Sequence, residues 1–186
     1  MACIARMSGL NERVILRPLP GLPIIHDLVV DMTNFFKQYH SVSPYLINTK
    51  MPPEKERLQS PAEHEKLNGS YECILCACCS SQCPSYGWNP EKFVGSAGLI
   101  QAYRFIVNSR DTTTDARLDD LSDLYRLFRC RTIINCVEVC PKGLEPVHAI
   151  ETIRQKMLGI DETGGLEMHN PNLPSDGGCV DSSIRF

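Results

Sequence analysis

Seven of the ten cysteines in this chain fall into two short runs with matching spacing. The first run holds Cys73, Cys76, Cys79 and Cys83, and the second holds Cys130, Cys136 and Cys140. Each run ends in Cys-Pro, and Ile133 stands in the second run where the first has its second cysteine. Thiolates are soft ligands that select iron–sulfur clusters, zinc or Cu(I). The cysteine runs therefore predict a metal centre.

The spacing favours a pair of iron–sulfur clusters. It follows the bacterial two-cluster ferredoxin pattern, in which the last cysteine of each run binds the other run's cluster. On this pattern one cluster takes Cys73, Cys76, Cys79 and Cys140, and the other takes Cys83, Cys130 and Cys136. Because Ile133 removes a thiolate from the second site, that site cannot ligate all four irons of a cubane. The sequence predicts one [4Fe-4S] and one [3Fe-4S] cluster.

Two other uses of the cysteines are less favoured. A lone Cys-x2-Cys pair would fit structural zinc as well, but two runs with matching Cys-Pro endings favour iron–sulfur. A disulfide framework is disfavoured because the cysteines are clustered and no secretory signal is visible. Cys78 lies off the ligand spacing and is interpreted as a small buried apolar residue.

Composition narrows the function further. With 186 residues and a net charge of −3, the chain allows one or two small domains and argues against a nucleic-acid partner. No window approaches eighteen apolar residues, so any membrane link must run through other subunits. Catalytic triads, phosphate loops and dinucleotide fingerprints are missing, which leaves electron transfer as the predicted chemistry. Reduced thiols imply a matrix or cytoplasmic compartment.

The elements that must position the cysteines are predicted to be mainly helices. Residues 1–26 look extended, with a strand-like run at 14–16, and a helix is expected from Asp27 through Leu28 to Tyr39. Residues 41–59 read as loop, and Ser60-Pro61-Ala-Glu63 is a capping box that opens a short helix ended by Gly69.

Three further helices alternate with the cysteine runs. Residues 95–109 form one, Thr114 caps a second with Leu118, Leu121, Tyr125 and Phe128 inward, and Pro146 opens a third through Met157. The fold class is thus mainly α, with residues 159–186 as a loosely ordered tail. The acidic residues Asp111, Asp115, Asp119, Asp120 and Asp123 are interpreted as a solvated helix face.

Several segments resemble the iron–sulfur subunit of succinate dehydrogenase, respiratory complex II. The resemblance covers residues 1 to about 158 and rests on Cys73-Ile-Leu-Cys-Ala-Cys-Cys, Cys83-Pro-Ser-Tyr-Gly-Trp88-Asn, Gln101-Ala-Tyr-Arg-Phe, Ser109-Arg-Asp, Cys140-Pro-Lys-Gly-Leu, Pro18-Leu-Pro and His26-Asp-Leu-Val-Val-Asp.

The resemblance implies a domain organisation. Residues 1–26 would be the C-terminal remnant of a plant-type [2Fe-2S] ferredoxin domain, and residues 27–158 an α-helical ferredoxin domain holding [4Fe-4S] and [3Fe-4S]. Most of the plant-type domain is absent from this sequence, and Cys3 matches the region of its fourth [2Fe-2S] ligand. Cys3 would then complete a cluster built by another chain; a free thiol near a terminus is the alternative. Some protists encode this subunit as two polypeptides, and a fragment of a longer chain would explain the sequence equally well.

The resemblance also implies a function. Electrons would pass from a flavoprotein subunit through the clusters to ubiquinone, with the ferredoxin half of this subunit and membrane-anchor subunits as further partners. The location would be the matrix side of the mitochondrial inner membrane or the cytoplasmic face of a bacterial membrane. A fumarate reductase subunit and a soluble two-cluster carrier remain alternatives.

Four residues would line the quinone site by this resemblance: Pro84, Ser85, Trp88 and Ile133. Two positions depart from the family, which usually has an aromatic residue at Gly87 and a histidine at Arg131. Arginine is always charged and cannot relay a proton as histidine can.

Overall fold

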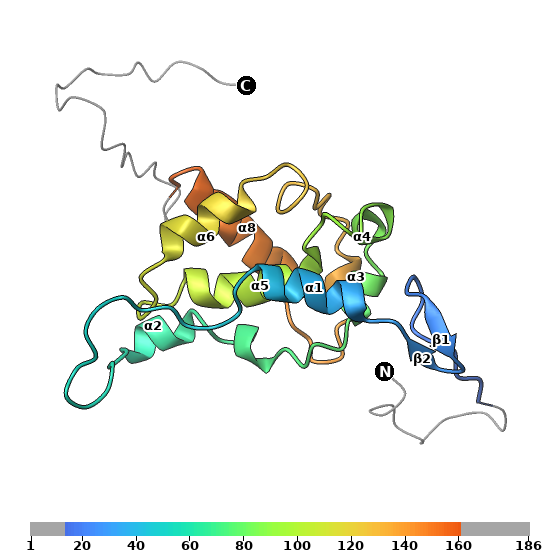
Figure 1. The fold of residues 1–186 in the computed structure, drawn as a ribbon, viewed down its shortest axis with the longest axis horizontal. Coiled ribbons are helices and arrows are strands. Elements are labelled where there is room, and N and C mark those ends of the chain that lie inside the picture. The colour runs from blue at the N-terminus through green and yellow to red at the C-terminus, as the bar shows by residue number, and fades with distance from the viewer. Residues whose placement is uncertain (1–13, 161–186) are drawn as a thin grey trace, which may run out of the picture.

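The computed structural model describes residues 14–160 and is mainly helical (Figure 1). The predictions for Cys3, for the other residues before 14 and for the tail from 161 onward lie outside the described residues. The elements are β1 (Ile24–His26), β2 (Val29–Val30), α1 (Thr33–Ser41), α2 (Pro61–Glu65), the 3-10 helix η2 (Ser70–Glu72), α3 (Cys78–Ser81), α4 (Pro84–Trp88), α5 (Gly95–Ile106), α6 (Thr114–Leu121), α7 (Asn135–Glu138) and α8 (Pro146–Met157).

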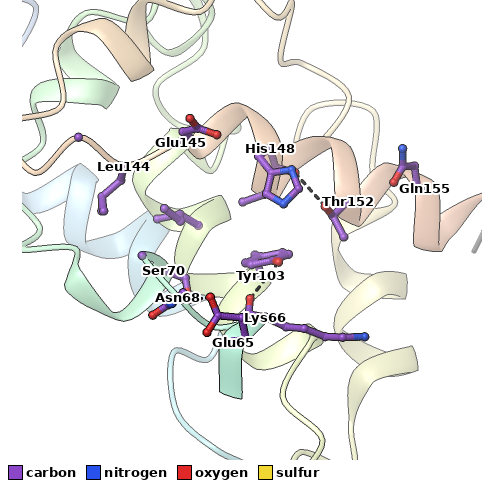
Figure 2. A pocket seen from close by; sticks show the side chains of 14 residues that line it. Glu65, Lys66, Asn68, Ser70, Tyr103, Leu144, Glu145, His148, Thr152 and Gln155 are labelled. Carbon is purple, nitrogen blue, oxygen red and sulfur yellow. Dashed lines mark hydrogen bonds between the residues drawn. The ribbon is translucent and has the colours of Figure 1, made fainter. Parts of the chain in front are cut away.

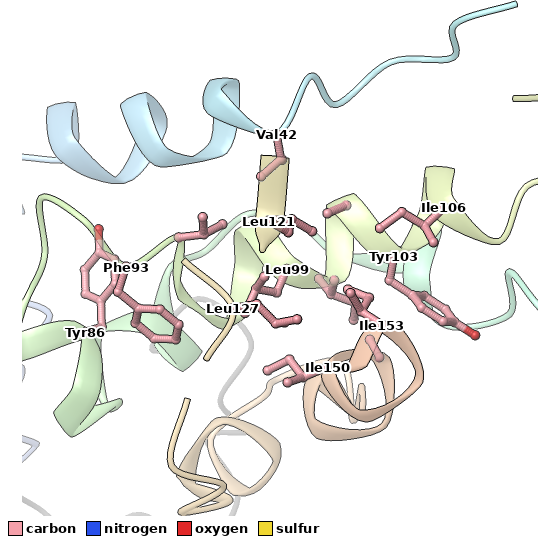
Figure 3. Close-up of a cluster of buried hydrophobic side chains, with 14 of the residues drawn as sticks. Val42, Tyr86, Phe93, Leu99, Tyr103, Ile106, Leu121, Leu127, Ile150 and Ile153 are labelled. Carbon is pink, nitrogen blue, oxygen red and sulfur yellow. The ribbon is translucent and has the colours of Figure 1, made fainter. Parts of the chain in front are cut away.

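Helix α5 forms the centre of the fold. It contacts α1, α3, α6, α8 and η2, and every one of its residues except Arg104 is buried. Leu99 on α5 packs with Leu121, Leu127, Ile150 and Ile153 in the main apolar cluster (Figure 3). Burying side chains of this size contributes about 1.5–3 kcal/mol each, so this cluster supplies much of the stability of the fold.

The predicted helices after the first cysteine run and after the second are both present. Pro146 occupies the first turn of α8, as predicted, and Ile150 and Ile153 face the core with at most 1% exposure. The capping box before α2 is also confirmed: Ser60 Oγ accepts the Glu63 N–H at 3.2 Å, and Glu63 Oε2 accepts the Ser60 N–H at 2.8 Å.

The prediction of a helix from Asp27 is wrong. Strands β1 and β2 form an antiparallel hairpin there, and Asp27 lies in its turn with a φ of +45°. The adjacent β-branched residues on both sides of the turn favour strand over helix. Helix α1 therefore begins only at Thr33, whose N–H is accepted by Asp31 Oδ1 at 2.8 Å. The run at 14–16 is extended but lies outside any described strand.

Helix α6 is shorter than predicted. It ends at Leu121, and Thr114 is its first helical residue rather than its cap. Asp123 Oδ1 then accepts the N–H of Tyr125 at 2.8 Å, a local turn that competes with helix continuation. Tyr125 and Phe128 are 41% and 40% exposed rather than inward-facing, while Leu127 takes the core position.

The solvated-face interpretation fails for Asp111, whose side chain is fully buried in an ion pair with Arg117. The closest atoms, Arg117 Nη2 and Asp111 Oδ2, are 2.9 Å apart. Arg117 also donates to the carbonyls of Val42, Ser43 and Tyr45 at 3.1, 2.8 and 2.7 Å. The pair therefore holds the loop after α1 against α6. The other four aspartates of the stretch are exposed, as predicted.

Candidate metal centre

The first cavity gathers thiols from both cysteine runs. It has an empty volume of about 380 Å³ and is lined by Cys73, Cys76, Cys79 and Cys140. The rest of its wall is mostly apolar and includes Ala97 of α5, with Lys142 as a basic side chain. These are the four cysteines that the spacing assigns to one cluster, including the one from the distant second run.

The second cavity is likewise lined by cysteines from both runs. Its empty volume is about 300 Å³, and Cys83, Cys130 and Cys136 line it. Ile133 lines it too, at the position where the first cavity has Cys76. Cys83 comes from the first run and Cys140 from the second, so each run contributes its last cysteine to the other run's cavity. The structure thus brings together both predicted ligand sets.

All eight cysteines in the described part of the chain are free thiols. Within residues 14–160, no three histidine, cysteine, aspartate or glutamate side chains converge closely enough to hold a single metal ion. The thiols lie instead around the walls of the two cavities. Cys78 is 8% exposed and is outside the described lining of either cavity, in keeping with its interpretation as a buried apolar residue.

The backbone of both runs adopts the same strained conformation. Leu75 and Ala77 have φ values of +53° and +59°, and the equivalent Thr132 and Ile134 have +54° and +73°. Left-handed backbone costs roughly 1–2 kcal/mol for a residue other than glycine. Ala77 and Ile134 directly precede α3 and α7, whose first turns carry Cys79 and Cys136. Strain of this kind collects at functional sites; sequence reasoning missed it because no glycine marks these positions.

Electrostatics around the sulfurs is dominated by burial. Burial, followed by the neighbouring Cys73 and Cys76 thiols, raises the pKa of Cys79 to about 12. Burial also raises the pKa of Cys83, although the N–H groups of Tyr86 and Ser85 at the start of α4 oppose it. A bound cation deprotonates a coordinating thiol outright. Burial thus favours the neutral thiol form of Cys79 and Cys83 when no metal is bound.

Backbone N–H donors face two other sulfurs, and a buried hydroxyl lies in the wall of the second cavity. The Leu144 N–H donates to Cys140 Sγ at 3.4 Å, and the Thr132 N–H donates to Cys130 Sγ at 3.5 Å. Ser85 is fully buried and lines the second cavity, and its Oγ has no hydrogen-bond partner among the described residues. An acceptor in the cavity would satisfy this hydroxyl, and cluster sulfurs are acceptors. The residues present thus fit an iron–sulfur cluster.

The predicted quinone residues divide into two groups. Pro84, Ser85 and Ile133 line the second cavity, whereas Trp88 lies outside its lining. Trp88 is 62% exposed at the end of α4, and its ring lies 5.9 Å from the guanidinium of Arg129.

A further hollow lies between the segment after α2, helix α5 and helix α8, and it shares Ile100 and Leu144 with the lining of the first cavity (Figure 2). Tyr103 and His148 approach each other across it with ring centroids 6.3 Å apart, and the Tyr103 hydroxyl donates to the Lys66 carbonyl at 3.1 Å. None of the cysteines within residues 14–160, and none of the predicted quinone residues, is in the described lining of this hollow. Among residues 14–160, no helix is long and apolar enough to cross a membrane.

Comparison with known proteins identifies the family. A family model described as a 4Fe-4S dicluster domain matches residues 72–145. The succinate dehydrogenase iron-sulfur subunit of Coxiella burnetii is 58% identical over 164 residues, 88% of this chain and 70% of that protein. The mitochondrial succinate dehydrogenase [ubiquinone] iron-sulfur subunit 1 of Oryza sativa subsp. japonica is 50% identical over 85% of this chain and 57% of its own length.

The iron-sulfur subunit of Paracoccus denitrificans is 48% identical, and this chain covers 61% of it. The chain therefore spans between 57% and 70% of these three relatives. Among solved structures, a chain of the Mycobacterium smegmatis Sdh1 complex in the apo form shares the fold, with a TM-score of 0.70 at 20% identity over 92% of this chain and 70% of that one. With this identity over most of its length, and with its dicluster domain, the chain belongs to the family of succinate dehydrogenase iron–sulfur subunits.

Proposed function

We propose that this chain is the electron-transfer subunit of a succinate:quinone oxidoreductase and relays electrons from a flavoprotein subunit to ubiquinone. The observation that carries the proposal is the crossed arrangement of the cysteines. Cys140 lies in the cavity of the first run and Cys83 in the cavity of the second. Two-cluster ferredoxins exchange their last cysteines in this way. The crossing also makes both runs and α5 between them one folding unit.

The ligand sets follow from the cavities. Cys73, Cys76, Cys79 and Cys140 would hold [4Fe-4S], and Cys83, Cys130 and Cys136 would hold [3Fe-4S]. Clusters bound there would accept and release single electrons. The chain's own contribution is to fix the thiols on strained turns and to exclude water, since Ala97 and Cys136, in the walls of the first and second cavities, are only 1% and 7% exposed. These sites lie in the proposed α-helical ferredoxin domain, residues 27–158.

Exposed apolar side chains beside the second cavity support a quinone site there. Ile133 and Ile134, both in the cavity wall, are 45% and 49% exposed, and Trp88, at the end of the helix that Pro84 begins, is 62% exposed. Exposed apolar groups that gather on one face mark binding surfaces. We assign Pro84, Ser85, Trp88 and Ile133 to the quinone site, and the surrounding face to the membrane-anchor subunits. We propose the matrix side of the mitochondrial inner membrane, or the cytoplasmic face of a bacterial membrane, as the location of the complex.

The N-terminal hairpin supports a second partner. Ile24, Ile25, Leu28 and Val29 are between 51% and 68% exposed on β1, the turn and β2. A two-stranded hairpin is marginally stable alone and needs a surface to pack on. We assign residues 1–26 to the end of a plant-type ferredoxin domain whose remainder completes a [2Fe-2S] cluster with Cys3. A Cys3→Ser variant should perturb the [2Fe-2S] EPR signal and leave the other two clusters unchanged.

The experiment that tests this function is addition of succinate to the purified complex. The EPR signals of both clusters should show reduction, and added ubiquinone should reoxidise them. If the chain instead purifies alone, with two clusters that succinate and flavoprotein do not reduce, it is a soluble carrier and the proposal is wrong.

A further inference from the structure

The first turn of α5 lies between the two cavities and presents a different side chain to each. Ser96 lines the second cavity, and the next residue, Ala97, lines the first. Both are buried, at 2% and 1% exposure. The positive end of the helix macrodipole acts within the first turn, so it reaches both cavities and does not distinguish them. The side chains at positions 96 and 97, a hydroxyl and a methyl group, do distinguish the two cavities.

Hydroxyl side chains line the second cavity. They belong to Ser85, Ser96 and Thr132, whereas the described lining of the first cavity contains no hydroxyl side chain. Outside that lining, the buried Ser80 hydroxyl lowers the pKa of Cys79 against the rise that burial causes. Ser96 shares this cavity with a proposed ligand. Ser96 and Cys136 both line it, and both are buried, at 2% and 7% exposure. The Ser96 side chain is thus placed beside the sulfurs of the second site.

We propose that Ser96 raises the reduction potential of the second cluster by donating a hydrogen bond to its sulfur ligands. The inference rests on the proposed function, in which Cys83, Cys130 and Cys136 hold that cluster. Reduction adds negative charge to a cluster, and a donor to its sulfurs stabilises the reduced state. At this turn of α5 the second cluster would face a hydroxyl and the first a methyl group, a difference that raises the second potential relative to the first. Ser96 is therefore a positioning residue that favours electron flow from the first site to the second.

Removal of the Ser96 hydroxyl tests the proposed effect on the reduction potential directly. In an EPR-monitored redox titration of the assembled complex, Ser96→Ala should lower the midpoint potential of the second cluster and leave that of the first unchanged. Ser96→Thr keeps the hydroxyl and should stay close to the parent value. Ser70→Ala is the matched control, because Ser70 is also buried, at 3% exposure, but its hydroxyl donates to the Leu67 carbonyl away from both cavities. It should shift neither potential.

The reciprocal change gives an independent readout. Ala97→Ser adds a hydroxyl at the first cavity and should raise the midpoint potential of the first cluster only. The Ala97→Ser variant still tests the inference if the Ser96→Ala complex does not assemble. In that case Ser96→Gly is a second way to remove the hydroxyl.

The results of these experiments distinguish a failure of the Ser96 proposal from a failure of the proposed function. If the second cluster is present but its potential is the same in Ser96→Ala as in the parent, the inference is wrong and the proposed function stands. If Ala97→Ser leaves the first potential unchanged, the role of this helix turn is likewise overturned. If the parent complex has no second cluster, both proposals fall.

Discussion

The proposed three-iron composition of the second cluster site rests on Ile133, because this residue lines that cavity where the first cavity has a cysteine. Ile133→Cys would supply the missing thiolate at a position that is already 45% exposed, so the change should not disturb the core. We expect the site to take up a fourth iron and its potential to fall, because cluster type sets the potential. EPR of the oxidised complex should lose the three-iron signal. Its persistence in a fully loaded variant would contradict the ligand assignment.

A Trp88 variant tests the last step, the transfer of electrons from this chain to the quinone. Its indole N–H is a hydrogen-bond donor, and 62% of the residue is exposed near the second site. Trp88→Leu should slow quinone reduction severalfold while succinate still reduces both clusters at the parent rate. Tyr45→Leu, at an aromatic residue that is 60% exposed in the loop after α1, is the control and should change neither rate. Equal loss of both activities in Trp88→Leu would indicate a structural role.

Some features of single residues could be predicted from the sequence and others could not. The grouping of the thiols could be predicted because ligand spacing is a local property and the crossing follows a known pattern. The left-handed Ala77 and Ile134 could not, because nothing in their side chains favours a positive φ. The role proposed for Ser96 could not be predicted either, because the sequence does not show that α5 places this residue in the wall of the second cavity.

At the scale of elements, helices with strong apolar periodicity were predictable and their ends were not. Helix α8 matched because Pro146 fixes its start and its inward residues recur regularly. Helix α6 was predicted too long because the turn at Asp123 overrode the periodicity that includes Tyr125 and Phe128. The residues from Asp27 formed a hairpin because cross-strand pairing of Ile24 with Val30 competes with the helix.

The buried Arg117–Asp111 pair should be the most sensitive polar contact between elements. Arg117→Met leaves the Asp111 carboxylate buried without its partner, which typically costs about 3–5 kcal/mol. We expect a clearly lower urea midpoint for loss of cluster absorbance. Arg126→Met is the control, because the Arg126–Asp120 pair is 21% and 50% exposed and such pairs contribute about 0–1 kcal/mol. Similar midpoints for both variants would mean that the buried pair does not hold the loop.

At the scale of the whole molecule, the hairpin should attach the chain to its ferredoxin partner. Ile25 is 68% exposed on β1, and Ile25→Asp would place a charge in the proposed interface. We expect loss of the [2Fe-2S] signal from the purified complex with the other two clusters retained. Leu58→Asp, in the loop before α2 and 82% exposed, is the matched control and should keep all three signals. Retention of the [2Fe-2S] signal in Ile25→Asp would place the partner elsewhere.

The crossing of the two cysteine runs is the central claim, and EPR of a Cys140→Ala complex tests it most directly. Cys140 is the last cysteine of the second run but lies in the cavity of the first. We expect the [4Fe-4S] signal to be lost or converted while the three-iron signal persists, together with lower stability because metal binding contributes to folding. A complex that keeps its [4Fe-4S] signal and loses only the three-iron signal would contradict the crossed ligation.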